Sequence, residues 1–141
     1  MKNYSNVMRK HGKTFFWASW FLDGELASLV FAVYAFCRRL DDLVDNNANK
    51  KNLHNLIFLS DLMKKNKYYG AFEEFKGFDK KSLPREIIVS EFLKGQVSDL
   101  NYKQPKSIDQ LLVYCYQVAG SVGLMVCDVI GIKNKELKYY A

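Results

Sequence analysis

The sequence predicts an all-α protein. Its apolar residues mostly recur three and four positions apart, which is the spacing of one helix face, and no sustained strand-like alternation bounded by turn residues occurs. The chain has two prolines in 141 residues, so few positions interrupt a helix. With 49% hydrophobic and 26% charged residues, we expect residues 1–141 to form one globular unit with a buried core.

The N-terminal part is expected to hold a short and a long helix. The short helix covers about residues 3–10 and precedes an irregular aromatic segment from Gly12 to Leu22. The long helix begins near Glu25, with Asp23 as its cap, and ends near Asp45, where a run of asparagines follows.

Three further helices are expected beyond this point. Proline is tolerated in a first helical turn, and a serine followed three residues later by glutamine forms a capping box. An aromatic and basic stretch over residues 68–82 separates the first of these helices from the second. They cover about residues 50–66, from Pro84 to about Tyr102, and from the capping box at Ser107 and Gln110 to near Gly131.

The chain is basic, with a formal net charge of +6. We expect its lysine clusters on solvated helix ends and loops, with contact to a membrane surface or an anionic ligand as the alternative. No basic stripe interleaved with aromatic residues accompanies the charge, so no nucleic-acid partner is expected. The clustered residues are Lys50, Lys51, Lys64, Lys65, Lys67, Lys80 and Lys81.

The cysteines and the apolar runs bear on location. Cys37, Cys115 and Cys127 are odd in number and far apart, so they are expected to be reduced core residues of a cytoplasmic protein. No signal-peptide pattern is present, and no apolar run reaches the roughly 18 residues of a membrane-spanning helix. Peripheral contact with a membrane remains open.

The segment Tyr34–Asp45, YAFCRRLDDLVD, carries the candidate chemistry. At about 100° per residue, Tyr34, Arg38, Asp41 and Asp45 share an arc of about 60°, and Asp42 lies to one side. Carboxylates one turn apart repel each other, so this apolar helix needs a neutralising group. Mg²⁺ is suited, because it takes one or two protein carboxylates and fills its other positions with water and phosphate. Arg38 would hold a phosphate or pair with a carboxylate.

The alternative is that Asp41, Asp42 and Asp45 only solvate the exposed end of a buried helix, with Arg38 and Arg39 as ion-pair partners. Apolar residues earlier on the same face favour a binding site, because they would give one cavity a charged end and an apolar wall. A ligand with a diphosphate head and a hydrocarbon tail fits such a wall. These apolar residues are Ala27, Phe31 and Tyr34.

The segment Tyr34–Asp45 resembles the first aspartate-rich motif of the squalene/phytoene synthase family. Three further segments resemble motifs of that family in the same order: His11–Ala18 (HGKTFFWA), Gly95–Leu100 (GQVSDL) and Tyr114–Gly123 (YCYQVAGSVG). The resemblance implies the N-terminal part of an isoprenoid-synthase helical bundle around a central substrate cavity. It also implies Mg²⁺-dependent head-to-head condensation of two geranylgeranyl diphosphates to phytoene, with squalene or dehydrosqualene synthesis from farnesyl diphosphate as the alternative.

The resemblance assigns roles to individual residues, with Mn²⁺ able to replace Mg²⁺. Without it, the last helix shows only a core-packing face, and its glycines at 120 and 123 would mark close helix crossings. The implied metal ligands are Asp41, Asp42 and Asp45, the implied catalytic residues are Arg38, Asp41, Asp45 and Tyr114, and the implied substrate-binding residues are Phe15, Tyr34, Arg38, Tyr114, Val118, Val122 and Gly123.

The family's second aspartate-rich motif does not occur in these 141 residues, and family members are about twice as long. We therefore expect a partial domain that has no synthase activity alone and exposes an apolar face. The expected partners are prenyl diphosphates, a separate C-terminal half and a membrane surface. The competing hypothesis is a non-catalytic helical module that binds a membrane or a protein partner.

Overall fold

The computed structural model describes residues 4–46, 58, 72–100, 103–134 and 136. Every regular element in these ranges is helical and none is a strand, which confirms the all-α prediction. The expected helix over residues 50–66, Phe58 apart, and the lysines at 50, 51, 64, 65 and 67 fall outside the described residues. The elements are α1 (Ser5–His11), α2 (Lys13–Ala18), η1 (Ser19–Phe21), α3 (Gly24–Asn46), η2 (Glu73–Phe75), η3 (Lys80–Ser82), α6 (Glu86–Leu100), α7 (Ile108–Cys115), the π-helical η4 (Tyr116–Gly120) and α8 (Ser121–Val129).

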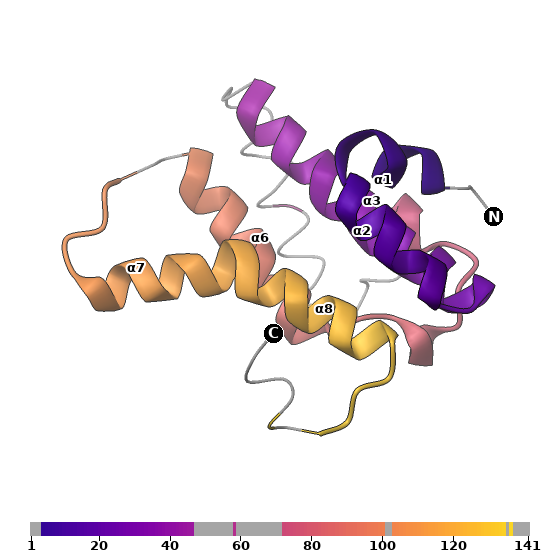
Figure 1. The fold of residues 1–141 in the computed structure, drawn as a ribbon. Coiled ribbons are helices and arrows are strands. Elements are labelled where there is room, and N and C mark those ends of the chain that lie inside the picture. Colours follow the sequence, from indigo (N-terminus) through magenta and orange to yellow (C-terminus); the bar gives the residue numbers. More distant parts are fainter. Residues whose placement is uncertain (1–3, 47–57, 59–71, 101–102, 135, 137–141) are drawn as a thin grey trace.

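Helix α3 is the centre of the packing. It contacts α1, η2, α6 and α8. The elements α7, η4 and α8 follow one another as a rod, in which α8 lies beside α3 and α7 extends away from the α1–α3 group (Figure 1). No residue of α7 is buried, so one end of this rod belongs to the core and the other to the surface.

The segment from Gly12 to Leu22 is more regular than expected. The sequence predicts it to be irregular, but it forms α2 and η1, and only Gly12 interrupts the chain between α1 and α2. Aromatic pairs four residues apart support these turns: Phe16 packs edge-on to Trp20, and Trp17 to Phe21, with ring centroids 6.4 and 5.5 Å apart.

Helix α3 begins as predicted. The Asp23 carboxylate accepts a hydrogen bond from the Leu26 backbone N–H at 2.9 Å, which confirms Asp23 as the cap. Farther along, Phe36 is fully buried among three other aromatic rings, with centroids 4.7, 5.2 and 5.9 Å away. These rings belong to Phe72, Phe75 and Phe92, so η2 and α6 both pack on this part of α3.

Helix α6 begins at Glu86, two residues later than Pro84. The prediction that Pro84 lies in its first turn is therefore wrong. The carbonyl of Arg85 accepts the first helical hydrogen bonds, and the backbone N–H and Nε of Arg85 both donate to the Asp128 carboxylate, at 3.1 and 2.9 Å. Because Asp128 belongs to α8, this contact fixes the start of α6 against the rod rather than through the proline.

The capping box at the start of α7 is present in altered form. Ser107 Oγ accepts a hydrogen bond from the Gln110 backbone N–H at 3.2 Å, as expected, but Gln110 Oε1 accepts from the Lys106 N–H instead of the Ser107 N–H. The rod ends at Val129, and Gly131, with a φ of 78°, closes it close to the predicted position.

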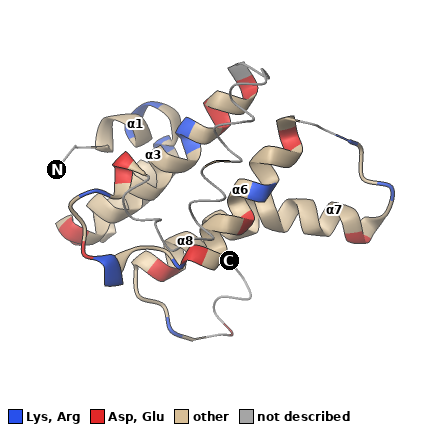
Figure 2. Cartoon of the chain, turned by 180° about the vertical axis from the view of Figure 1, so that it is seen from behind, with Lys and Arg blue, Asp and Glu red and all other residues tan. Residues whose placement is uncertain are grey.

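Charge is unevenly distributed over the helices. Figure 2 shows α7 as almost entirely uncharged apart from an acidic residue near its start, which is Asp109.

The segment Ile108–Val129 is long and apolar enough to cross a membrane, with a mean hydropathy of 1.5. The expectation that no apolar run is long enough for a membrane span does not hold for this segment, in which polar residues such as Gln117 and Ser121 interrupt the run. It is weak evidence for a membrane helix, since α8 packs on α3 and α6. Lys80 and Lys81 are exposed, as expected.

Helix α6 approaches η4 closely at Gly95. A Cβ at this position would lie 2.9 Å from Val118 Cγ1 and 3.1 and 3.2 Å from the Cβ and backbone carbon of Gln117. Only glycine therefore permits this distance between the two elements.

We predict that Gly95→Ala lowers the free energy of unfolding by about 1–3 kcal/mol, because the added methyl group overpacks the contact between α6 and η4. Urea unfolding followed by circular dichroism measures it. Gly24→Ala is the matched control, since its Cβ would meet nothing within 4 Å, and it should leave stability unchanged or raised by up to about 1 kcal/mol. Equal stability of the two variants would contradict the close contact.

Candidate active site

One cavity of about 710 Å³ lies between the N-terminal segment, α3, α6 and the rod. Its lining is mainly apolar at the η4 and α8 side and carries charged side chains from α3. The structure brings seven of the predicted site residues to this cavity: Phe15, Tyr34, Arg38, Asp41, Val118, Val122 and Gly123.

The wall that α3 gives to the cavity differs from the expected one. Ala27, Phe31 and Tyr34 are expected on it, but of these only Tyr34 lines the cavity, together with Val30 and Val33. Phe31 stacks on Phe16 of α2, with ring centroids 6.0 Å apart. The helical segment α2, which the sequence did not predict, therefore covers the face on which Phe31 lies.

Tyr34 reaches the cavity because the chain opposite it has no side chain. A Cβ at Gly12 would lie 2.8 Å from Tyr34 Cζ and 2.9 Å from its hydroxyl oxygen. Phe15 packs obliquely against Tyr34, with centroids 6.5 Å apart, and is itself 65% exposed. The junction between α1 and α2 thus fixes the place of both rings.

Asp41 is the carboxylate that the cavity contains. It is half-buried, and its Oδ1 accepts a hydrogen bond from Gln96 Nε2 at 2.8 Å. Partial burial raises the pKa of the Asp41 carboxyl, and the negative charges of Asp45 and Asp42 raise it further, while the Gln96 hydrogen bond and Arg38 act in the opposite direction. A bound cation would therefore stabilise the ionised form of the Asp41 carboxyl, which burial and the neighbouring carboxylates disfavour.

Arg38 and Asp42 form an ion pair, with Arg38 Nη2 and Asp42 Oδ1 2.6 Å apart. This hydrogen bond raises the pKa of the Arg38 guanidinium. Asp42 lines a different pocket, of about 380 Å³, to which Arg38 and Arg39 also contribute. Arg39 binds the buried Glu74 of η2 through two hydrogen bonds. The alternative in which Arg38 and Arg39 serve as ion-pair partners is therefore partly correct. Arg38 pairs with Asp42 as expected, whereas Arg39 pairs with Glu74.

Asp45 is exposed one turn beyond Asp41 and does not line the cavity. Within the described ranges, no three His, Cys, Asp or Glu side chains are grouped closely enough to hold a metal ion by themselves. The donors nevertheless fit Mg²⁺, which needs one or two protein carboxylates, because Asp41 and Asp45 offer hard oxygen atoms on successive turns. The assignment of Asp41, Asp42 and Asp45 as ligands stays a prediction.

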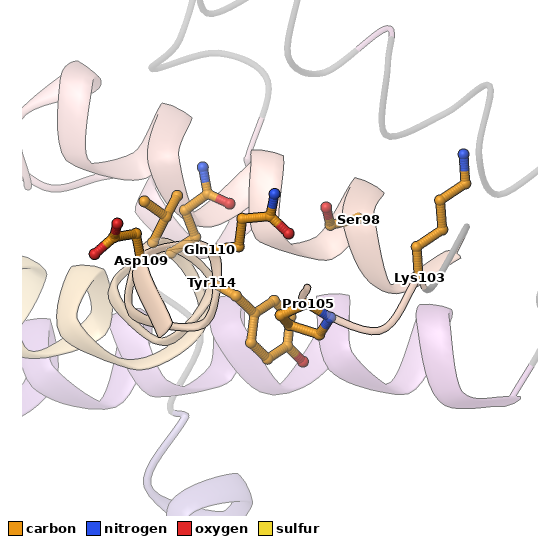
Figure 3. A pocket seen from close by; sticks show the side chains of 8 residues that line it. Ser98, Lys103, Pro105, Asp109, Gln110 and Tyr114 are labelled. Atoms are coloured by element: carbon orange, nitrogen blue, oxygen red, sulfur yellow. The ribbon is translucent and has the colours of Figure 1, made fainter. Parts of the chain in front are cut away.

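Tyr114 lies apart from these residues. Its hydroxyl donates a hydrogen bond to Asp99 Oδ1 at 2.8 Å, and its side chain lines a pocket of about 410 Å³ between α6 and α7. Figure 3 shows this pocket, with Ser98 from α6 and Asp109 and Gln110 from α7. The expected role of Tyr114 at the diphosphate stays a prediction. In this structure Tyr114 joins α7 to α6 through its hydrogen bond to Asp99.

The cysteines are free, as expected, but not all lie in the core. Cys37 and Cys127 are buried, whereas Cys115 is exposed on α7, a helix with no buried residue. Cys37 lines the cavity, and burial strongly raises the pKa of its thiol. At neutral pH Cys37 therefore lines the cavity as an uncharged thiol.

The sequence motifs agree with this geometry. A sequence model of the squalene/phytoene synthase family matches residues 8–141. The chain belongs to the squalene/phytoene synthase family. The matched range contains all four motifs whose order resembles that of the family.

Individual family members are similar over most of this chain. Phytoene synthase 3, chloroplastic, from Zea mays is 32% identical over 133 residues, which are 89% of this chain and 31% of that protein. Phytoene synthase, chloroplastic, from Narcissus pseudonarcissus is 32% identical over 137 residues, 93% of this chain and 32% of that protein. The chain spans about a third of the length of these relatives.

The fold is also similar to a solved structure of the family. A crystal structure of a dehydrosqualene synthase in complex with ligand superposes with a TM-score of 0.74 at 34% sequence identity. The match covers 89% of this chain and 45% of that one. It confirms the predicted fold class, a helical isoprenoid-synthase bundle, of which this chain corresponds to somewhat less than half.

The raised pKa of Asp41 predicts a pH-dependent effect of Asp41→Asn on the metal-free chain. Because the folded state holds this proton more tightly than the unfolded state, stability falls as pH rises through the ordinary Asp pKa of about 3.9 to the higher folded value. At neutral pH the variant should be more stable than the parent, by at most about 1 kcal/mol, since the carboxylate is partly exposed.

Urea unfolding at a series of pH values measures this difference. It should vanish near pH 2, where both states of the parent are protonated. A variant that is less stable than the parent at pH 7, or a difference that does not change with pH, would contradict the burial of this charge.

Proposed function

We propose that this chain provides the first metal–diphosphate site and part of the hydrocarbon wall of a phytoene synthase, which joins two geranylgeranyl diphosphates head to head. One observation carries the proposal: a single cavity joins Asp41 and Arg38 to the apolar side chains of Val118 and Val122. A diphosphate needs cationic and metal-binding groups, and a prenyl tail needs a long apolar surface, so the two ends of this cavity suit the two ends of one substrate.

The metal belongs to this proposal. Asp41 and Asp45 would hold Mg²⁺, with Mn²⁺ as a substitute, and Asp42 would contribute only if it exchanged Arg38 for the cation. When bound, Mg²⁺ supplies Lewis-acid stabilisation of the diphosphate leaving group. The support is chemical: two carboxylates on successive turns repel each other, and partial burial of Asp41 strengthens the need for a counter-charge.

Other side chains would bind and enclose the substrate. Arg38, charged at any physiological pH, would hold diphosphate oxygens. The rings of Phe15 and Tyr34 would exclude water and face the allylic cation, since aromatic faces attract cations. Val118, Val122 and Gly123 would line the tail, and the absence of a side chain at position 123 leaves room for it.

Farnesyl diphosphate is the second candidate substrate, giving squalene or dehydrosqualene. The similarity to a dehydrosqualene synthase structure at 34% identity favours it, while the curated phytoene synthases favour the C20 substrate. Incubating a protein that joins this chain to a family C-terminal part with each diphosphate, followed by product chromatography, distinguishes the two.

We propose that the C-terminal part of a family-length domain, on the same or a separate polypeptide, covers α7. Ile108, Leu112 and Val113 expose 57–70% of their surface there, which suits a packed neighbour better than water. A membrane surface is the competing partner for the same apolar side chains.

For the cellular location, the buried reduced cysteines suit the cytoplasm, while the plant relatives are named chloroplastic.

Calorimetric titration with a non-hydrolysable prenyl thiodiphosphate tests the proposal. Binding should require Mg²⁺, and Asp41→Asn should weaken it about 10-fold or more, because the variant loses a metal ligand. Asp109→Asn, on the exposed start of α7, is the control and should bind like the parent.

Binding that survives both removal of Mg²⁺ and Asp41→Asn would refute the proposed metal site. Gly123→Phe tests the tail wall separately: its ring would enter the cavity and should weaken a C20 ligand more than inorganic diphosphate. Equal losses for the two ligands would argue against a tail at this wall.

A further inference from the structure

Gln96 is a buried polar side chain that stands directly behind Asp41. It is 3% exposed and lies on α6, 55 residues away from Asp41 in the sequence. Its Nε2 donates to Asp41 Oδ1 at 2.8 Å. The other oxygen, Asp41 Oδ2, accepts no hydrogen bond within the described part of the chain, and Asp41 borders the cavity whereas Gln96 does not. The amide therefore holds one carboxylate oxygen from the protein side and leaves the other oxygen available.

The same amide is poorly satisfied otherwise. Gln96 Oε1 is buried and has no hydrogen-bond partner among the residues that the structure describes. An unpaired buried acceptor costs folding free energy, so an apolar side chain of similar length would pack at this position with less penalty. Packing alone therefore does not account for a glutamine at this position, whereas its hydrogen bond to Asp41 does.

The neighbouring residue fixes where this amide lies. Gly95 allows α6 to approach Val118 and Gln117 of η4, and Gln96, the next residue along the same helix, reaches α3. The position of the amide is thus set by backbone packing on two sides of α6, which limits its movement.

We infer that Gln96 is a positioning residue that fixes the Asp41 carboxylate, through the hydrogen bond to Oδ1, with Oδ2 directed to a divalent cation. This inference rests on the proposed function, because it needs Asp41 to bind metal. Residues that orient a metal ligand commonly change metal affinity without touching the metal. Gln96 fits this pattern, since it contacts the ligand and lies outside the cavity.

The test compares Gln96→Met with the parent in two measurements. Methionine is unbranched and of similar length, and it removes both the hydrogen bond and the unpaired oxygen. Mn²⁺ affinity, followed by the electron paramagnetic resonance signal of the free ion, should fall about 10–100-fold. Thermal unfolding without metal should occur at the same or a higher temperature than in the parent.

Gln117→Met is the matched control. Gln117 also donates a side-chain hydrogen bond to a carboxylate, Glu91, at 3.3 Å, but neither of these two residues lines the cavity or is the hydrogen-bond partner of Asp41. Its Mn²⁺ affinity should equal that of the parent, which separates a specific effect from the general loss of an amide.

Three results would overturn parts of this scheme in different ways. Parent-like Mn²⁺ affinity in Gln96→Met refutes the positioning role. A large drop in its unfolding temperature, with an affinity loss that Gln117→Met shares, assigns Gln96 to the structural core instead. Absence of Mn²⁺ binding in the parent and both variants refutes the metal site on which the inference depends.

Discussion

The structure depends on one constraint: α3 must be buried along most of its length and still end in carboxylates that water and ligands can reach. Ala32, Val33, Phe36 and Leu40 are at most 1% exposed, so neighbours surround this helix on several sides. Burial of these apolar side chains supplies the free energy that holds the helix in place. Apart from Glu25 in its first turn, the charged residues of α3 lie between Arg38 and Asp45, where Asp42 and Asp41 line separate pockets.

Helix α6 connects the two chemically different sides of the cavity. Gly95 brings it close to η4, whose Val118 forms part of the apolar wall, and Gln96 joins it to the Asp41 carboxylate. Adjacent residues of one rigid helix thus contact the wall and the charged end. A displacement of α6 would alter both, which is why this helix sets the relative positions of a tail and a diphosphate in the proposed site.

Local patterns in the sequence predicted the helical fold, the Asp23 cap, the extent of α3 and the end of the rod near Gly131, because each depends on residues within one or two turns. The errors concern tertiary packing. Phe31 lies away from the cavity because Phe16 covers it, and Pro84 precedes α6 because Asp128 anchors Arg85. The Gln96–Asp41 contact joins residues 55 positions apart, and no periodicity could reveal it, although Gln96 lies within a recognised motif.

The short helical segment α2–η1 has a practical consequence. It contributes Phe15 and Ala18 to the cavity lining, and it also carries both tryptophans of the chain, Trp17 and Trp20, which are 58% and 71% exposed. Indole emission depends on the polarity of its surroundings, and no tryptophan elsewhere adds a background. Tryptophan emission, excited selectively over the nine tyrosines of these 141 residues, therefore reports on the segment that borders the cavity. The molecule thus contains its own optical probe for whatever covers this segment.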